Sequence, residues 1–274
     1  MSNHHGISLP EDLAHALPSF PADLFGAAVM LGSGLGNFAD HLTIHSQIPT
    51  SELPGYPTST VAGHEGSLLL AEHSGKTILL FKGRIHGYEG YSGQATTLPA
   101  GIAAALGAKT LILTNAAGGL APTTKAGDLM LITDVVVPPA APRMGMQLHG
   151  HADEWRQLPR PLFPDSMLEL ARQAARESRV GLREGTYGFC SGPTYETRSE
   201  IAFFRSIGID AAGMSTVPEI MHGVRAGLDV IGISCITNKA LTVRQVVTHE
   251  EVTTVAAAVS ETFSRLLLAI ISRL

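Results

Sequence analysis

The sequence has few cysteines, no long apolar run and no excess of positive charge. Its 274 residues include two cysteines, Cys190 and Cys235, each inside an apolar stretch, so two buried thiols in a reducing compartment are expected rather than a disulfide framework. No apolar stretch approaches the roughly 20 residues of a membrane-spanning helix. The N-terminus lacks the basic and apolar segments of a signal peptide. We therefore expect a cytoplasmic protein that does not enter a membrane.

The charge and composition also limit the choice of partner. The formal net charge is -5 and charged residues make up 16% of the chain, which argues against non-specific binding of nucleic acid. Hydrophobic residues make up 45%, an ordinary value for a folded protein. Because the chain shows no repeat, low-complexity segment or linker, we expect a single domain over residues 1–274.

Short apolar runs alternate with amphipathic ones, which predicts an α/β fold. The predicted strands are Ala27–Leu31, Ser67–Glu72, Thr77–Lys82, Thr110–Thr114, Leu129–Val137, Thr186–Cys190, Asp210–Met214 and Asp229–Ile236. The predicted helices are Gln94–Leu106, Asp165–Glu177, Arg198–Ile207, Val217–Ala226 and Glu250–Ile271. Thr216 with Glu219, and Thr248 with Glu251, have the Thr-x-x-Glu spacing of a helix-capping box. The proline-rich segment from Val137 to Phe163 is expected to be a long irregular excursion.

Residues suited to bind an anion follow several of the predicted strands. Gly32 to Gly36 can bring backbone N–H groups close to an anion, and Ser33 adds a hydroxyl. In GRIHGYEG, an extended backbone would project Arg84, His86 and Tyr88 from one face. Ser215 lies just before a predicted helix start, another place where anions bind. Each segment also has a purely structural interpretation, respectively as a tight turn, a solvated edge strand or an ordinary capped helix.

Other segments carry groups that suit a heterocyclic base. Asn238 follows a strand and could bind the edge of a base, and Tyr195 beside Glu196 could supply a ring and a carboxylate. The small residues of TNAAGG, which include Ala116, leave room for a ligand, while Met214 offers an apolar surface. Because nearly all of these segments fall at predicted strand ends, where α/β sheets form their ligand crevice, we expect them to converge.

The motifs GSGLG, GRIHGYEGY, TNAAGG, GPTYET, GMSTVPE and ITNK, in this order, resemble those of the trimeric purine nucleoside phosphorylases. The resemblance runs from about Val29 to His249. It implies a phosphorylase/hydrolase-like fold, with a twisted mixed β-sheet flanked by helices. It also implies a homotrimer that acts on a purine nucleoside with inorganic phosphate as co-substrate.

The same resemblance implies a role for each site residue. The phosphate site would consist of Ser33, His64, Arg84, His86, Ala116 and Ser215; the ribose site of Tyr88, Met214 and His249; and the base site of Tyr195, Glu196, Thr237 and Asn238. Phe163 would reach the site of a neighbouring subunit. His86, Glu196 and Asn238 would act in catalysis.

The expected reaction is phosphorolysis of (deoxy)inosine and (deoxy)guanosine, as in purine salvage. No cofactor is expected, and no metal, because the sequence has no Cys/His cluster at ligand spacing. Three alternatives stay open: a 5′-methylthioadenosine phosphorylase, a xanthosine phosphorylase, and a nucleotide-binding module without catalysis. The first resembles this chain but carries Asp at the position of Asn238.

Overall fold

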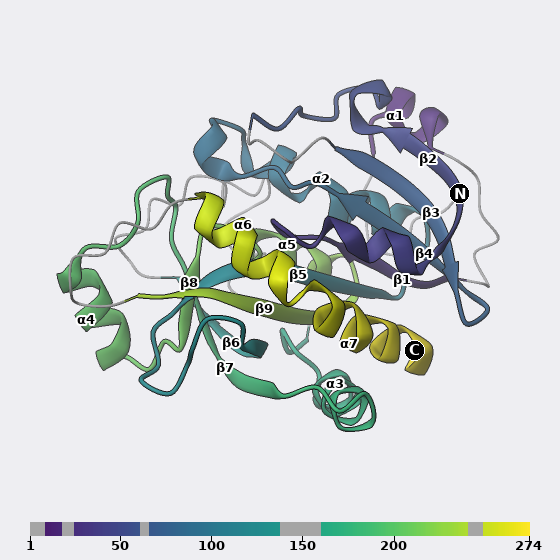
Figure 1. Ribbon diagram of the computed structural model, residues 1–274. Helices are drawn as coiled ribbons and strands as arrows, with labels where there is room; N and C mark the ends of the chain where they lie inside the picture. The colour runs from purple at the N-terminus through teal and green to yellow at the C-terminus, as the bar shows by residue number, and fades with distance from the viewer. Residues whose placement is uncertain (1–8, 18–24, 61–65, 138–159, 241–248) are drawn as a thin grey trace.

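A nine-stranded mixed sheet runs through the molecule, with helices packed on both faces (Figure 1). The computed structural model describes residues 9–17, 25–60, 66–137, 160–240 and 249–274. The strands are β1 (Phe25–Met30), β2 (Thr43–Pro49), β3 (Ser67–His73), β4 (Lys76–Lys82), β5 (Thr110–Gly119), β6 (Leu129–Val136), β7 (Leu182–Phe189), β8 (Ala211–Gly213) and β9 (Asp229–Lys239).

The strand order explains how distant motifs meet. The sheet runs β2-β3-β4-β1-β5-β8-β7-β6-β9, and β9 also pairs with β5, so the last five strands close into a ring. Strands β4, β1, β5 and β9 are parallel and end at one edge. Strand β8 runs the other way, pairing Ala212 with Gly118 and Ala211 with Gly119, so the chain after β8 returns along β5. The predicted mixed sheet is therefore confirmed.

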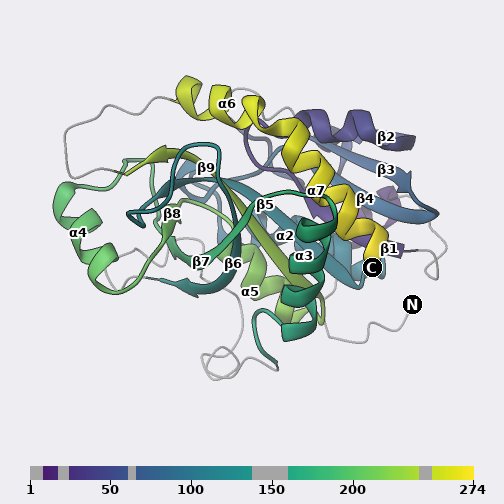
Figure 2. The ribbon, with the colours of Figure 1, turned by 60° about the horizontal axis from the view of Figure 1, so that its bottom comes forward.

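The helices form a layer on each face of the sheet. Helices α2 and α5 pack together against β1, β5 and β9, while α3, α6 and α7 cover the opposite face (Figures 1 and 2). The helices are α1 (Glu11–Ala16), α2 (Gly93–Ala105), α3 (Asp165–Glu177), α4 (Arg198–Ser206), α5 (Val217–Arg225), α6 (His249–Ala258) and α7 (Ser260–Arg273). Between the layers, β1, β5 and β9 are buried almost completely, which fits their unbroken apolar runs.

The predicted elements are present, with four differences. Strands β5, β7 and β9 are longer than predicted. Strand β7 already begins at Leu182, and β5 and β9 continue to pair to Gly119 and Lys239, so TNAAGG and ITNK lie within strands. The edge strand β2 was not predicted, since it is mostly exposed and lacks an apolar pattern. Helix α1 was not predicted either.

The fourth difference is at the C-terminus, where the predicted single helix is two. It breaks at Val259 and turns by 61°. This bend lets α6 contact β9 while α7 packs against α3. Within the described ranges no single helix is long and apolar enough to cross a bilayer; the bent α6–α7 pair meets that test only when its two helices are counted together.

One predicted helix cap is wrong. Thr216 precedes α5, but it has a positive φ of 79° and its side chain makes no capping hydrogen bond. The carboxylate of Glu219 pairs instead with Arg84. The second predicted box includes Thr248, which lies outside the described residues. A capping box does start α4, where the Thr197 hydroxyl accepts from the Glu200 N–H.

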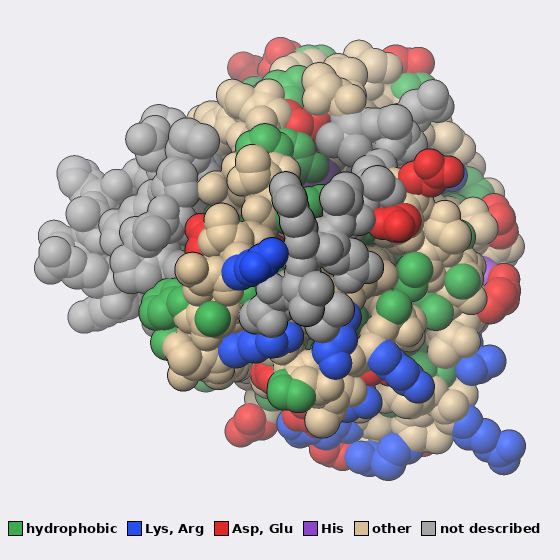
Figure 3. All heavy atoms as spheres, turned by 60° about the vertical axis from the view of Figure 1, so that its left-hand side comes forward, with side chains coloured by type: hydrophobic (Ala, Val, Ile, Leu, Met, Phe, Trp, Pro, Cys, Tyr) green, Lys and Arg blue, Asp and Glu red, His purple; other side chains and the backbone are tan. Residues whose placement is uncertain are grey.

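Acidic and basic side chains are mixed on the surface. Lys and Arg side chains gather on the face shown in Figure 3, with Asp and Glu side chains among them. The ion pairs include Arg172 with Glu184 and Arg183 with Asp128.

Gly32 is required by a close backbone approach at the end of β1. A Cβ at this position would lie 2.7 Å from the Cα of Asn115 and 2.9 Å from the carbonyl oxygen of Thr114. At Gly36, by contrast, a Cβ would first meet the end of the flexible Lys82 side chain at 3.2 Å. The two glycines of one loop therefore differ in what surrounds them.

We predict that Gly32→Ala lowers the free energy of unfolding by about 1–3 kcal/mol, because the β5 backbone cannot move away. The control Gly36→Ala should change it by less than about 0.5 kcal/mol, since only a flexible side chain has to shift. Urea unfolding followed by circular dichroism measures both. Equal unfolding midpoints for the two variants would contradict this account.

Candidate active site

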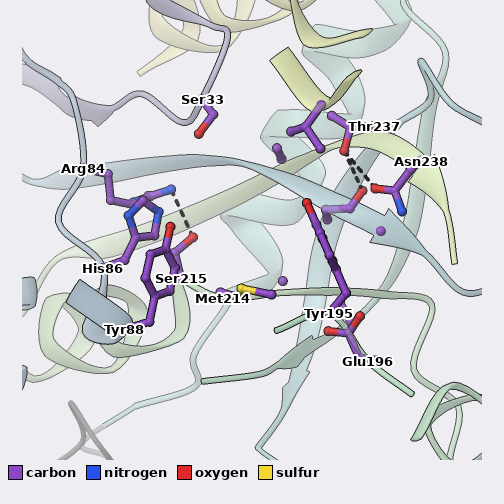
Figure 4. Close-up of a pocket in the computed structure, with 16 residues that line it drawn as sticks. Ser33, Arg84, His86, Tyr88, Tyr195, Glu196, Met214, Ser215, Thr237 and Asn238 are labelled. Atoms are coloured by element: carbon purple, nitrogen blue, oxygen red, sulfur yellow. Dashed lines mark hydrogen bonds between the residues drawn. The ribbon is translucent and has the colours of Figure 1, made fainter. Parts of the chain in front are cut away.

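One pocket gathers predicted residues from six separate segments of the chain (Figure 4). Arg84, His86, Tyr88 and Ser215 lie at one end, Tyr195, Glu196, Thr237 and Asn238 lie at the other, and Met214 lies between them. Ser33 and Ala116 also line the pocket. The predicted convergence at one edge of the sheet is thus observed.

Arg84 is a buried cation whose neighbours come from three parts of the fold. Its side chain is 2% exposed, and its Nε lies 2.9 Å from Oε1 of Glu219, which is equally buried. Its Nη1 donates to the carbonyl oxygen of Thr114 at 2.7 Å and to the Ser215 hydroxyl at 3.4 Å. A buried guanidinium needs such partners, and here they also fix its position at the pocket wall.

The Gly32–Gly36 loop is attached to β5 through one hydroxyl. Thr114 is fully buried; its Oγ1 accepts from the Gly32 N–H at 2.9 Å and donates to the Met30 carbonyl at 3.0 Å. Gly34 has a positive φ of 76°. These contacts hold the loop where Ser33 lines the pocket.

His86 is oriented by a carboxylate and an aromatic ring. Its Nδ1 lies 3.2 Å from Oε1 of Glu89, and its ring stacks on Tyr88 with centroids 4.8 Å apart. The backbone is not extended as predicted, because residues Gly87–Glu89 form a 3₁₀ turn. Glu89 Oε2 also accepts from Ser59 and Thr60.

The environment lowers the pKa of Glu89. Burial acts to raise this pKa, but hydrogen bonds from Thr60, His86 and Ser59 outweigh burial and hold it below its ordinary value. Glu89 therefore stays ionised beside His86 and offers its carboxylate to the imidazole as a hydrogen-bond acceptor.

The other end of the pocket presents amide and carboxylate groups. The Thr237 hydroxyl lies 3.2 Å from Asn238 Oδ1 and 3.4 Å from the Ala117 carbonyl. Asn238 packs over Gly118, where a Cβ would lie 3.4 Å from Asn238 Nδ2. Glu196 is half-buried, and burial together with Glu196 raises the pKa of the neighbouring Cys190.

The middle of the pocket is apolar. A Cβ at Gly192, whose φ is 64°, would lie 2.5 Å from Met214 Sδ and 2.9 Å from the Tyr88 ring, so this glycine lets Met214 and Tyr88 approach the same backbone. Burial, followed by the charge of Glu89, raises the pKa of Tyr88 to about 12. The Tyr88 hydroxyl is therefore a neutral hydrogen-bonding group at physiological pH.

Three predicted residues are not seen in the pocket. His64 lies outside the described residues, as does the side chain of His249, where α6 begins. The prediction that Phe163 reaches a neighbouring subunit is wrong. Its side chain is 7% exposed and packs in the hydrophobic core of its own chain. A ring held there is not available to a neighbouring subunit.

The residues that support the pocket were not found from the sequence. The spacing of Glu219 from Thr216 predicts only a helix cap. Glu89 belongs to the motif GRIHGYEG, but no role is predicted for it. Val252, which belongs to none of the motifs, also lines the pocket. No sequence signal separates a carboxylate that caps a helix from one that pairs with a distant arginine.

Metal ligands do not gather in the described part of the chain. No group of three or more His, Cys, Asp or Glu side chains there could hold a metal ion. The pocket instead combines a cationic end, an apolar middle and a polar end, which suits a ligand with an anion, a sugar and a base.

Comparisons with known proteins agree with this geometry. Residues 27–272 match the model of the phosphorylase superfamily. The chain is 39% identical to purine nucleoside phosphorylase 1 of Bacillus subtilis, over 89% of this chain and 91% of that one. It is 38% identical to the purine nucleoside phosphorylase of Bos taurus, over 88% and 85%. A Schistosoma mansoni purine nucleoside phosphorylase solved with inosine superimposes with a TM-score of 0.82, at 30% identity, covering 96% of this chain and 95% of that chain.

We predict that Glu219→Gln destabilises the protein by about 3–5 kcal/mol, because it leaves the Arg84 charge buried without its partner. The matched control is Glu184→Gln. It breaks an exposed pair of nearly equal length, 2.8 Å to Arg172, and should cost far less because water replaces the lost contact. Chemical denaturation of both variants measures the difference. Similar losses would mean that burial does not set the strength of the Arg84 pair.

Proposed function

Since this chain belongs to the phosphorylase superfamily and acts as a purine nucleoside phosphorylase, we propose that it prefers 6-oxopurine nucleosides and works as a homotrimer. The substrates are inosine, guanosine and their 2′-deoxy forms. The products are the free base and (deoxy)ribose 1-phosphate. The observation that carries the proposal is the polarity of the pocket, with Arg84 at one end and Asn238 at the other.

Phosphate binds at the cationic end and attacks C1′ of the ribose. Arg84 and the hydroxyls of Ser33 and Ser215 hold the anion, together with the backbone of Ala116. Nδ1 of His86 faces Glu89, so Nε2 is the ring atom left to contact the anion. No side chain acts as a nucleophile, and neither a metal nor a cofactor takes part. From the family resemblance, His64 joins this subsite and His249 contacts the 5′-hydroxyl.

The glycosidic bond breaks as the sugar takes on oxocarbenium character and the purine gathers negative charge. Tyr88 and Met214 contact the ribose, and Tyr195 packs against the base. Asn238 donates to the O6/N7 edge, and Glu196 accepts from N1–H. Both contacts strengthen as charge develops, so they stabilise the transition state more than the substrate.

The preference for a 6-oxo base follows from the orientation of Asn238. When the Thr237 hydroxyl donates to Oδ1, the amide leaves its Nδ2 donor for the base. A 6-oxopurine offers two acceptors on that edge, whereas adenine places a donor at N6 and has no N1–H for Glu196. The mismatch leaves buried polar groups unpaired.

We predict strictly phosphate-dependent cleavage of inosine and guanosine, with kcat/KM for adenosine lower by roughly 10²-fold or more. Asn238→Asp should narrow this gap, because a carboxylate accepts from N6. The measurement is release of free base from inosine, guanosine, xanthosine, adenosine and 5′-methylthioadenosine, with and without phosphate. Wild-type turnover of adenosine equal to that of inosine would refute the base-recognition model. Equal turnover without phosphate would refute phosphorolysis.

The proposed trimer places active sites near subunit boundaries. Phe203 and Ile207 support this, because they lie one turn apart at the end of α4 and are 47% and 43% exposed. Tyr195, shortly before the same helix, is 47% exposed. Large exposed apolar side chains gathered on and before one helix are typical of a surface that another chain covers.

We predict that light scattering gives the mass of a trimer for wild type and a smaller mass for Phe203→Glu, because a charge would be buried in the contact. Ile44→Glu is the control. Ile44 is 40% exposed but lies on the edge strand β2, at the far end of the sheet, so the trimer should persist. A fully active wild-type monomer would refute the trimer.

A further inference from the structure

The turn between β8 and α5 has a rare and strained backbone. Thr216 has φ 79° and ψ -47°, and the Val217 N–H donates to the Ser215 carbonyl at 2.9 Å. This is the strained form of γ-turn, which non-glycine residues avoid unless the surroundings impose it. Thr216 is also completely buried.

Two side chains hold this turn in place. The Tyr187 hydroxyl donates to the Ser215 carbonyl at 3.2 Å, and burial raises the pKa of Tyr187, so the hydroxyl keeps its proton. Asn115 Nδ2 donates to Thr216 Oγ1 at 2.9 Å. Tyr187 and Asn115 are 0% and 1% exposed. The Ser215 carbonyl is therefore occupied inside the protein, while its side chain lines the pocket.

The hydrogen bonds around Ser215 determine which way its proton points. Thr216 Oγ1 lies 3.1 Å from Ser215 Oγ, and Arg84 Nη1 lies 3.4 Å from it. Because Asn115 donates to Thr216 Oγ1, the Thr216 hydroxyl can in turn donate a hydrogen bond to Ser215 Oγ. The Ser215 oxygen then accepts from Thr216 and from Arg84, which uses both of its lone pairs. Its own proton must point elsewhere, and the pocket is the open direction.

We propose that Asn115 and Thr216 are positioning residues, forming a donor relay that fixes the Ser215 hydroxyl as a hydrogen-bond donor to the phosphate. The relay runs from the Asn115 amide to the Thr216 hydroxyl and on to Ser215. It rests on the proposed function, in which Ser215 binds phosphate. The γ-turn has a clear use in this arrangement, since it brings the Thr216 hydroxyl within reach of both Asn115 and Ser215.

The test is a change of polarity without a change of shape. Asn115→Asp replaces the donor by an acceptor, so Thr216 donates to residue 115 instead of Ser215. The Ser215 proton is then free to turn toward Thr216, away from the anion. The KM for phosphate should rise about 10- to 100-fold, the range for one hydrogen bond to a charged group, while the KM for inosine stays unchanged. Thr216→Val, which keeps the branched shape but breaks the relay, should act alike. Thr216→Ser, which keeps the hydroxyl, should retain most of the phosphate affinity.

The same substitutions made in a Ser215→Ala protein distinguish the relay from simple charge repulsion between residue 115 and the phosphate. In Ser215→Ala, neither Asn115→Asp nor Thr216→Val should raise the phosphate KM further, because no hydroxyl remains to orient. An equal rise in that background would overturn the relay in favour of direct repulsion or general damage. A rise in the KM for inosine of similar size would also overturn it, since the damage would then not be confined to the anion.

The single variant Ser215→Ala distinguishes the two proposals. If it raises the phosphate KM but Asn115→Asp and Thr216→Val do not, the relay is wrong and the phosphate site stands. If Ser215→Ala itself has no effect, Ser215 does not bind phosphate, so this part of the proposed function and the relay both fail. Thermal melting of each variant shows whether it remains folded.

Discussion

A guanidinium that is almost completely buried has to be neutralised from inside the protein, and much of this structure is arranged around that requirement at Arg84. Its partners are a backbone carbonyl of β5, a hydroxyl after β8 and a carboxylate of α5. Each comes from a different element, so these three contacts form together only when the tertiary structure has assembled. A cation held in this way has already lost its water and meets an incoming anion at low cost.

The parallel pairing of β5 with β9 sets the distance between the two ends of the pocket. It continues to Gly119 and Lys239, through a bulge after Ala117, and places Ala116 and Asn238 on neighbouring strands of a rigid sheet. The return of the chain along β5 after β8 then brings Met214 and Ser215 beside these residues. Ala116 at the anion end and Asn238 at the base end are thus fixed relative to each other by the backbone hydrogen bonds of the sheet, which favours accurate alignment of phosphate with C1′.

The backbone around the pocket includes strained and closely approached positions. Thr216 holds a conformation that costs free energy, and Gly32 and Gly192 tolerate approaches that leave no room for a Cβ. Such features are found where geometry matters more than stability. Here they bring a serine hydroxyl, a methionine and a tyrosine ring to the walls of one pocket, while the surrounding core is apolar and regular.

The sequence by itself determined the α/β class, nearly all of the helices and strands, and most residues of the pocket. Apolar periodicity is a local property, and motifs such as GRIHGYEG and ITNK can be read in place. Tertiary structure alone decided the role of Glu219, which has the spacing of a helix cap but pairs with Arg84, 135 positions earlier in the chain. It also placed Phe163 in the core and bent the last helix at Val259. These outcomes depend on contacts between distant segments, and local sequence patterns do not encode which segments will meet.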